Sequence, residues 1–224
     1  MDKIITVFHG SEHIVKTPVF GKGRAANDYG RGFYLTKDKH LAGEWAVLWS
    51  GKDGYINEYL LDLGGLNVLE LDELPIENWI AILMVNRRGD YTEELEDRLN
   101  QFTEKFVVDT SSFDVIQGYR ANDAFFRYVE AFTIGALSIE KLITAMKLGD
   151  LGIQVCLKSK RAFDAIQLIS TSQASVSVFQ ESARNRDISA REQYRSMREK
   201  GVGTTIFDML KEDYHGSVQR PVCS

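Results

Sequence analysis

Residues 30–36 have the sequence GRGFYLT, and this stretch decides the fold. Its apolar and aromatic residues, bounded by glycine, predict a short β-strand that carries Tyr34. Upstream, residues 4–8 predict a second strand, which ends at His9. Downstream, a helical stripe carries Trp45, eleven positions after Tyr34. The pattern predicts two strands and a helix that bring a histidine, a tyrosine and a tryptophan to one pocket for a flat ligand.

The rest of the chain alternates between strand and helix patterns. Apolar and β-branched runs predict strands at residues 55–63, 66–71, 113–116, 152–157 and 165–170. Helical periodicity predicts helices at residues 76–85, 92–108, 123–136 and 138–148. From residue 175 the chain is mostly polar and predicted to be helical, with a late apolar anchor at residues 206–210. The simplest arrangement is one α+β domain at residues 1–174 with a helical C-terminal extension at residues 175–224.

Composition and charge exclude several classes of protein. The 224 residues are 44% hydrophobic and 26% charged, which favours a folded chain with a sizeable core. The net charge of −5 argues against a protein that coats nucleic acid, because that role needs a basic surface. The sequence shows neither the pattern of a signal peptide nor an apolar run of bilayer-spanning length, so we expect a cytoplasmic protein.

A disulfide framework and a metal site are both unexpected. The two cysteines, Cys156 and Cys223, are far apart and form no Cys-x-x-Cys motif, which favours a reducing compartment. The four histidines have no metal-ligand spacing. We therefore expect no metal cofactor.

Four residues are suited to bind a nucleotide-like ligand. His9 at a strand end can hydrogen-bond a ribose hydroxyl, although a histidine there more often bonds only to backbone. The rings of Tyr34 and Trp45 suit a flat cationic ring, such as the nicotinamide of NAD, through stacking and cation–π attraction. Trp45 also lies on the apolar stripe of its helix, so a role in the core is the alternative. Arg31, beside the glycine-rich loop, suits a pyrophosphate, but surface arginines are common.

Several polar residues are candidates for chemistry. Glu58 lies in an alternating strand, where an outward-facing polar residue is an equally good explanation. Asp123 precedes a predicted helix, so it either lines a pocket or caps that helix. Gln154 opens a late strand, where its side chain can point into a pocket.

The order of these pieces resembles the ADP-ribosyltransferase superfamily of the diphtheria-toxin and poly(ADP-ribose) polymerase type, which is named for a His-Tyr-Glu triad. The resemblance covers roughly residues 4–170 and is closest to small bacterial proteins that look like the toxin half of toxin–antitoxin pairs. Besides the histidine, tyrosine and tryptophan segments, it rests on the motifs NDYG at 27–30, FDVIQG at 113–118, AND at 121–123 and GIQV at 152–155. It implies a split antiparallel β-sheet core with inserted helices, followed by the helical extension.

The resemblance also implies a role for each matching position. His9 would bond the ribose on the adenosine side of NAD, and the backbone of Gly10 would hold the nicotinamide amide. Tyr34 and Trp45 would sandwich the nicotinamide ring. The remaining positions expected to contact NAD are Ser11, Asn27 and Arg31.

The third triad position falls on Gln154, where the family pattern has glutamate. A glutamine can bond the ribose hydroxyl but brings no negative charge to an oxocarbenium-like transition state. The lost electrostatic stabilisation is on the order of a few kcal/mol. We expect either compensation by another acid, first Asp123 and then Glu58, or a slow or altered activity.

The resemblance therefore predicts an NAD-dependent ADP-ribosyltransferase, an intracellular bacterial toxin that transfers ADP-ribose to a macromolecular acceptor, protein or nucleic acid. Two alternatives remain. Water could be the acceptor, which would make the protein an NAD glycohydrolase, or the missing glutamate could leave a weakly catalytic NAD- or ADP-ribose-binding module. A cognate antitoxin protein is an expected partner, with residues 182–224 as its contact, and no membrane partner is expected.

Overall fold

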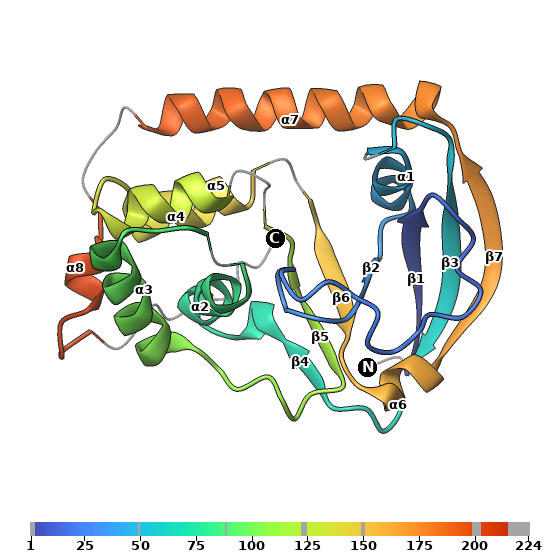
Figure 1. Cartoon of the computed structure of the whole chain (residues 1–224), viewed down its shortest axis with the longest axis horizontal. Helices are drawn as coiled ribbons and strands as arrows, with labels where there is room; N and C mark the ends of the chain where they lie inside the picture. Colours follow the sequence, from blue (N-terminus) through green and yellow to red (C-terminus); the bar gives the residue numbers. More distant parts are fainter. Residues whose placement is uncertain are drawn as a thin grey trace.

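The chain folds as an α+β structure in which seven strands form one mixed sheet (Figure 1). The computed structural model describes residues 3–48, 50–87, 89–121, 125–148, 151–198 and 203–214. The strands are β1 (Ile4–Ser11), β2 (Phe33–Thr36), β3 (Gly54–Asp62), β4 (Val68–Glu70), β5 (Val115–Tyr119), β6 (Ile153–Leu157) and β7 (Ile166–Ala174). The helices are α1 (Lys39–Leu48), α2 (Ile76–Asn86), α3 (Glu93–Phe106), α4 (Phe125–Thr133), α5 (Ile139–Met146), α6 (Lys160–Asp164), α7 (Val176–Arg198) and α8 (Ile206–Met209), and a 3₁₀ turn spans Leu71–Glu73.

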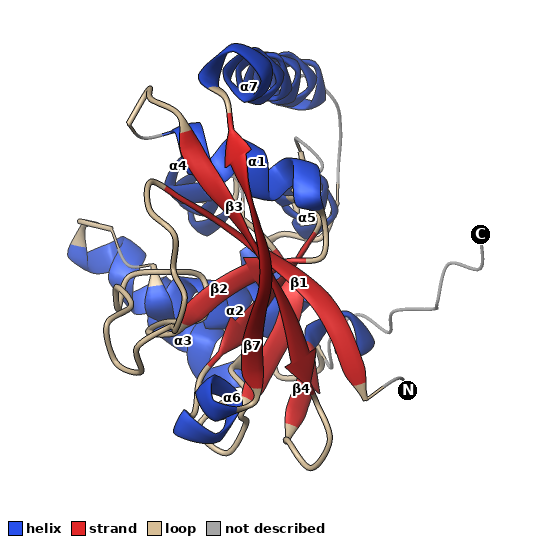
Figure 2. Ribbon diagram, turned by 90° about the vertical axis from the view of Figure 1, so that its right-hand side faces the viewer, coloured by secondary structure: helices blue, strands red, loops and turns tan. Residues whose placement is uncertain are grey.

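The strand order is β4-β5-β6-β2-β1-β3-β7, and the sheet is strongly twisted (Figure 2). The prediction of an α+β fold is confirmed. The prediction of a split antiparallel sheet is met in part: β4 and β5 are parallel, so the sheet is mixed, and its strands form one hydrogen-bonded order. It is narrowest between β1 and β2, which share the single register pair Phe8–Thr36, whereas β1 and β3 pair from Ile4 to Ser11. The sheet therefore has two halves, β4-β5-β6-β2 and β1-β3-β7, joined at one residue pair.

Helix α1 lies directly on β1 and β3. A Cβ atom at Gly10 would be 1.8 Å from the carbonyl oxygen of Ala42, and one at Gly54 would be 2.5 Å from that of Ala46. Only glycine allows the strand and helix backbones to approach this closely. This contact fixes α1, and with it Trp45, against the sheet.

The largest core lies between the β4-β5-β6-β2 half of the sheet and the helices α2, α3, α4, α5 and α8. Helix α3 contributes the apolar stripe expected from its sequence: Leu99, Phe102 and Phe106 are buried, and the Phe102 ring meets Phe132 of α4 edge-on at 5.6 Å. The opposite face of the sheet buries a smaller cluster that includes Val7, Leu35, Tyr59 and Phe163. Both faces of the central strands are thus covered.

Helix α7 runs along the molecule from α1 to the helical side (Figure 1). Near its start, Phe179 packs so tightly on α1 that a Cβ at Gly43 would be 2.3 Å from its ring. Further along, Ala190 is buried in the large core, and the ring of Tyr194 lies 4.2 Å from that of Tyr128. Helix α7 is therefore packed against both halves of the structure.

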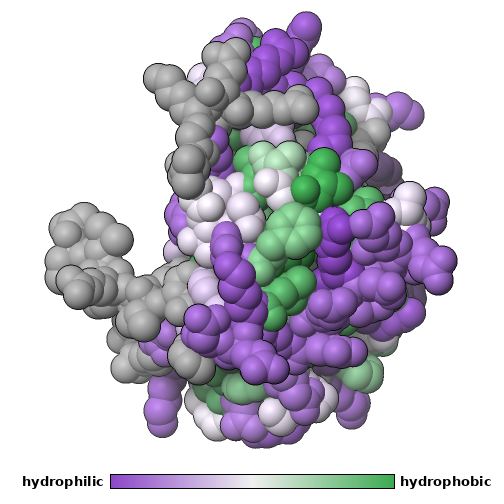
Figure 3. Space-filling model, turned by 90° about the vertical axis from the view of Figure 1, so that its left-hand side faces the viewer, coloured by the Kyte–Doolittle hydropathy of each residue, from purple (hydrophilic) through white to green (hydrophobic). Residues whose placement is uncertain are grey.

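The surface on the side of α3 and α8 is mostly hydrophilic, with a compact apolar area in its middle (Figure 3). Phe207 of α8 is 47% exposed, and its ring lies against Gly135. Among the described residues, no helix has both the length and the apolar character required to cross a bilayer.

Candidate functional site

The three positions of the resemblance lie on three neighbouring strands. His9 is on β1, Tyr34 on β2 and Gln154 on β6, and the sheet order β6-β2-β1 makes these strands adjacent. Across β2 and β6, Thr36 is in register with Gln154 and Tyr34 with Cys156. Positions that are far apart in the sequence therefore meet in the centre of the sheet.

His9 is half-buried and has a defined tautomer. Its Nδ1 lies 2.8 Å from the backbone oxygen of Tyr34, and its ring centroid is 4.5 Å from that of Phe33. Because a carbonyl oxygen can only accept, Nδ1 carries the hydrogen and Nε2 remains an acceptor. Burial lowers the pKa of His9, and the bond to Tyr34 opposes this shift. His9 is thus held neutral, with Nε2 free to accept a hydrogen bond from a ligand hydroxyl.

The side chains of His9 and Tyr34 lie on opposite faces of the sheet. Phe33 and Tyr34 are consecutive residues of a strand, so their rings point in opposite directions. The ring of Phe33, on which His9 packs, belongs to the smaller cluster with Tyr59. The ring of Tyr34 stacks instead on Tyr29 of the large core, at 6.4 Å between centroids. The two side chains do not converge on one pocket.

The hydroxyl of Tyr34 is bonded to the loop before β2. It donates to the backbone oxygen of Gly30 at 2.6 Å and accepts from the backbone nitrogen of Tyr29 at 3.0 Å. Burial raises the pKa of Tyr34 far above its usual value, so the phenol stays protonated. Tyr34 therefore anchors the loop that carries Asp28.

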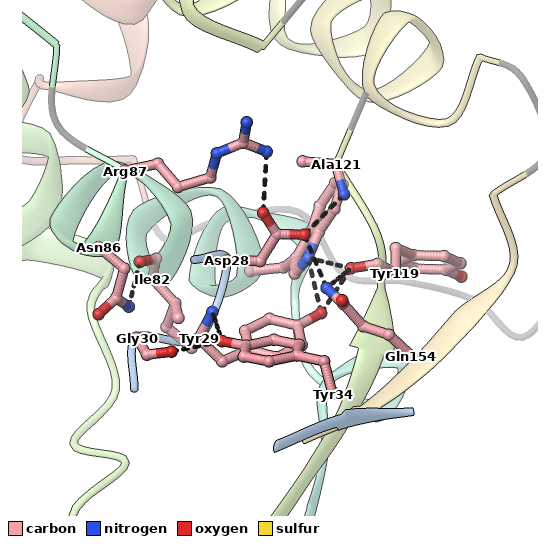
Figure 4. A network of polar contacts seen from close by, with 11 residues as sticks. Asp28, Tyr29, Gly30, Tyr34, Ile82, Asn86, Arg87, Tyr119, Ala121 and Gln154 are labelled. Atoms are coloured by element: carbon pink, nitrogen blue, oxygen red, sulfur yellow. Dashed lines mark hydrogen bonds and ion pairs between the residues drawn. The ribbon is translucent and has the colours of Figure 1, made fainter. Parts of the chain in front are cut away.

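Gln154 is buried and bonded to an acid that sequence reasoning did not select (Figure 4). Its Nε2 donates to Oδ2 of Asp28 at 2.7 Å and to the backbone oxygen of Tyr119 at 3.3 Å. Asp28 also accepts from Arg87 at 2.9 Å and from the backbone nitrogen of Ala121 at 3.0 Å. Since both partners of Nε2 are acceptors only, the amide orientation of Gln154 is fixed.

Aromatic residues complete this network beneath the sheet. The indole nitrogen of Trp79 donates to the hydroxyl of Tyr29 at 3.2 Å and to the backbone oxygen of Tyr119 at 3.1 Å. The hydroxyl of Tyr29 donates to the same oxygen at 2.5 Å. A Cβ at Gly118 would lie 2.6 Å from that hydroxyl, so glycine is required there. Buried networks whose members all have partners are rigid, and this one holds Asp28 and Gln154 in place.

The other residues expected to contact NAD on β1 and in the glycine-rich loop bond locally. The space above Gly10 is filled by the backbone of α1. The side chain of Ser11 donates to the backbone of His13 and accepts from Asn57. The amide of Asn27 donates to the backbone of Arg24 at 3.2 Å, and Arg31 donates to that of Gly21 at 2.7 Å.

Trp45 lines a groove of about 860 Å³ between α1 and α7. The guanidinium of Arg120, at the end of β5, lies 4.7 Å from the Trp45 ring centroid. The indole nitrogen is buried and has no hydrogen-bond partner among the described residues. Leu151 also lines the groove, and Arg120 donates to the backbone of Gly152. The groove therefore lies beside the start of β6, two residues before Gln154.

Neither of the two acids expected to compensate for the absence of a glutamate at position 154 is placed beside Gln154 by the described structure. Asp123 lies outside the described residues. Glu58 is on β3, in register with Phe8 and Ser170 in the other half of the sheet, and it bonds Ser170 at 2.8 Å. Asp28 is the acid in contact with Gln154, and its signal in the sequence was its place in the motif at residues 27–30. Within the described residues, no three His, Cys, Asp or Glu side chains are grouped to hold a metal ion.

Comparison with known proteins identifies one relationship. A family described as "Protein of unknown function (DUF3990)" matches residues 5–168, which include β1 to β6 and the first part of β7. No curated protein and no solved structure matches the chain.

Proposed function

The chain belongs to the DUF3990 family, and we propose that it is an NAD-dependent ADP-ribosyltransferase that passes ADP-ribose to a macromolecular acceptor and releases nicotinamide. The observation that supports this most strongly is the adjacency of β6, β2 and β1, which carry Gln154, Tyr34 and His9. The resemblance required these three positions to come together, although up to 145 residues separate them in the sequence.

The groove beside these strands has the size of a small-ligand site. Pockets that bind such ligands have volumes of roughly 300–1,000 Å³, and the groove between α1 and α7 measures about 860 Å³. Its wall holds Trp45, the second aromatic residue that the resemblance assigns to the nicotinamide. Tyr34, His9 and Gln154 do not line it. In the proposed reaction these three residues support the site from the sheet.

The reaction breaks the glycosidic bond between the nicotinamide nitrogen and the ribose carbon. Both bonding electrons leave with the ring nitrogen, which becomes neutral, and the acceptor nucleophile forms the new bond and gives up its proton. Positive charge develops on the ribose, and a carboxylate nearby would stabilise it. In this proposal Asp28 and Gln154 stand at the position of the glutamate but act as positioning residues, because Gln154 bonds Asp28 at 2.7 Å and the backbone oxygen of Tyr119, next to Arg120 in the groove wall. Arg87 offsets much of the charge of Asp28, so we expect slow turnover.

The direct test follows NAD with a label in its adenylate, with and without cell lysate, and measures both nicotinamide release and label on macromolecules. Gln154→Ala should lower nicotinamide release by up to about a hundredfold, the order expected when residues of the site are displaced by about 1 Å. Gln117→Ala is the matched control. Gln117 is a buried glutamine of β5 that bonds Glu70, and it is in register with Val155, so its side chain lies on the face of the sheet opposite to Gln154.

Other outcomes point to other functions. Nicotinamide release without labelled macromolecules would indicate an NAD glycohydrolase. NAD binding without release would indicate a binding module, in keeping with the hydroxyl of Tyr34 and the amide of Gln154 being bonded internally. Equal release by wild type and Gln154→Ala would contradict the assignment of this site. If the protein is a toxin, as the resemblance implies, its expression alone should arrest growth, and Gln154→Ala should relieve the arrest.

A further inference from the structure

The lining of the groove between α1 and α7 has two parts. One part carries arginine side chains of α7, and the other carries the indole of Trp45 and the guanidinium of Arg120. The lining includes four arginines, Arg120 from β5 and three from α7, against the three acids Glu44, Glu181 and Asp187. Two of these acids are paired within the groove wall, Glu44 with Arg186 and Asp187 with Arg191. This surplus of arginine is local, because the chain as a whole carries a net charge of −5.

Two arginines of α7 are placed to bind phosphate. Arg184 and Arg191 are seven residues apart, which is close to two helical turns, so they share one face of α7. Arg184 forms no ion pair within the described part of the chain. Arg191 pairs with Asp187, but both side chains are more than half exposed, and such pairs contribute little. Both guanidinium groups can therefore turn to a phosphate, which they bind with paired hydrogen bonds.

The aromatic part of the wall suits a nucleobase. Arg120 lies over the indole of Trp45, and planar guanidinium groups and indole rings both stack on bases. The indole nitrogen of Trp45 is a donor without a partner in the described structure. Buried donors are normally satisfied, and within the described residues no acceptor faces this one.

Helix α7 is fixed at two places along the groove, whose volume of about 860 Å³ is that of a small-ligand site. Towards its N-terminus, α7 is fixed on α1 by Phe179 and by the bond from Ser182 to Glu44 at 2.7 Å. Towards its C-terminus, α7 is fixed on the helical side by Ala190 and Tyr194. A groove of this volume suits a nucleotide, whereas a nucleic-acid strand would need an open channel.

We infer that this groove binds a nucleoside diphosphate, with the base on Trp45 and Arg120 and the phosphates on Arg184 and Arg191. The inference rests on the proposed function for its relevance, since ADP is one half of NAD, and it moves Trp45 from the nicotinamide, to which the resemblance assigns it, to the adenine. It assigns the phosphate contacts to α7, which lies beyond the residues matched by the family. The C-terminal helix is then part of the substrate site.

The test measures binding of ADP and of adenosine to the full chain by calorimetry. Wild type should bind ADP about tenfold or more tightly than adenosine, since guanidinium groups bind phosphate through charge-assisted hydrogen bonds that adenosine cannot form. The double variant Arg184→Gln, Arg191→Gln should lose this difference while its affinity for adenosine stays unchanged. Arg195→Gln is the control, because Arg195 is exposed on α7 but does not line the groove.

Equal affinities of wild type for ADP and adenosine, or unchanged ADP binding in the double variant, would overturn the inference. Displacement of ADP by a short single-stranded oligonucleotide that binds more tightly would overturn it as well. Melting temperatures of all variants show that the fold is retained. The proposed function fails separately: an ADP site with these properties in a protein that never releases nicotinamide would retain the groove and exclude the transferase.

Discussion

At the scale of single residues, the contact between Gln154 and Asp28 determines which side chains this site tolerates. Gln154 is 3% exposed and Asp28 is 6% exposed, and their polar atoms are 2.7 Å apart. An amide that donates to a carboxylate satisfies both groups, whereas two carboxylates at that distance would repel each other in a site with little water. A glutamine at position 154 therefore suits the presence of Asp28 better than the glutamate that the resemblance implies there.

Gln154→Glu should accordingly reduce stability and activity, although it introduces the glutamate that the resemblance implies at this position. We expect a loss of about 2–4 kcal/mol in the free energy of unfolding, the range for an uncompensated buried charge. Adding Asp28→Asn should recover much of this loss, because one carboxylate and one amide then face each other again. Urea denaturation and nicotinamide release measure both effects. A single Gln154→Glu variant that is more active than wild type would contradict this coupling.

His9 gives a prediction about pH. Burial lowers its pKa in the folded chain relative to the unfolded chain, so between the two values the unfolded chain binds more protons. The stability that the neutral ring contributes is present above the unfolded pKa of about 6.5 and is lost as the pH falls through the folded pKa. Wild type should lose more stability than His9→Gln between pH 7.5 and 5. An equal loss of unfolding free energy in the two proteins between pH 7.5 and 5 would contradict the lowered pKa of His9.

Sequence reasoning identified Gln154 as the position that departs from the family, but not its partner. The motif at residues 27–30 contains Asp28, yet 126 residues separate it from Gln154. No local pattern reports a contact across that distance. The same limit applies to Tyr34, whose aromatic ring suggested a ligand although its hydroxyl bonds to backbone four and five residues earlier.

At the scale of elements, α7 depends on Glu44 of α1. This carboxylate accepts from Nε and from one terminal nitrogen of Arg186, both at 3.1 Å, and from Ser182 at 2.7 Å. Its side chain is 5% exposed, whereas that of Arg186 is 25% exposed. One buried acid therefore holds the first half of a long, mostly polar helix.

Glu44→Gln should loosen this half of α7. We expect a loss of about 1–3 kcal/mol, less than for a fully buried pair because Arg186 keeps some contact with water. Limited proteolysis should then cut within α7 sooner than in wild type. The matched control is Asp187→Asn, which removes an exposed pair with Arg191 and should change stability by no more than about 0.5 kcal/mol. Equal effects of the two substitutions would contradict an anchoring role for Glu44.

Most elements were predictable because their signal is local. Helix α3 and strand β3 each lie within two residues of the range that their periodicity predicted. Helix α6 was missed, since a helix of five residues has too few turns to show a period. Strand β7 extends four residues beyond its prediction, to Ala174, because pairing with β3 stabilises a polar segment that lacks a strand pattern.

At the scale of the whole molecule, Cys156 reports on opening of the large core. It is fully buried on β6, and burial raises the pKa of its thiol to about 12. At pH 8 the folded protein therefore contains almost no thiolate at this position, and a reagent must wait for the core to open.

The arrangement of the whole molecule could not be predicted from the sequence. The strand order, the parallel pair of strands and the groove all depend on contacts between segments that are distant in the chain.

In a Cys223→Ser background, alkylation of Cys156 at pH 8 should be slower by orders of magnitude than in denaturant. The free energy of unfolding should also decrease above about pH 9, so the protein becomes less stable, because only the unfolded chain then releases the thiol proton. Time-resolved mass spectrometry follows the labelling. Rapid labelling under native conditions would mean that β6 is reached without global opening.

The pairing of β7 with β3 has a practical consequence for expression. The two strands pair from Ile166 with Leu61 to Ala174 with Gly54, so a fragment that ends at residue 168 would cut β7 after its third residue. Much of β3 would then become an unprotected edge with free backbone donors and acceptors, a template for intermolecular pairing. Such a fragment should elute as large aggregates in size-exclusion chromatography, whereas a chain that continues through α7 should elute as a defined species. We therefore expect the shortest fragment that folds by itself to extend beyond residue 168, where the family match ends.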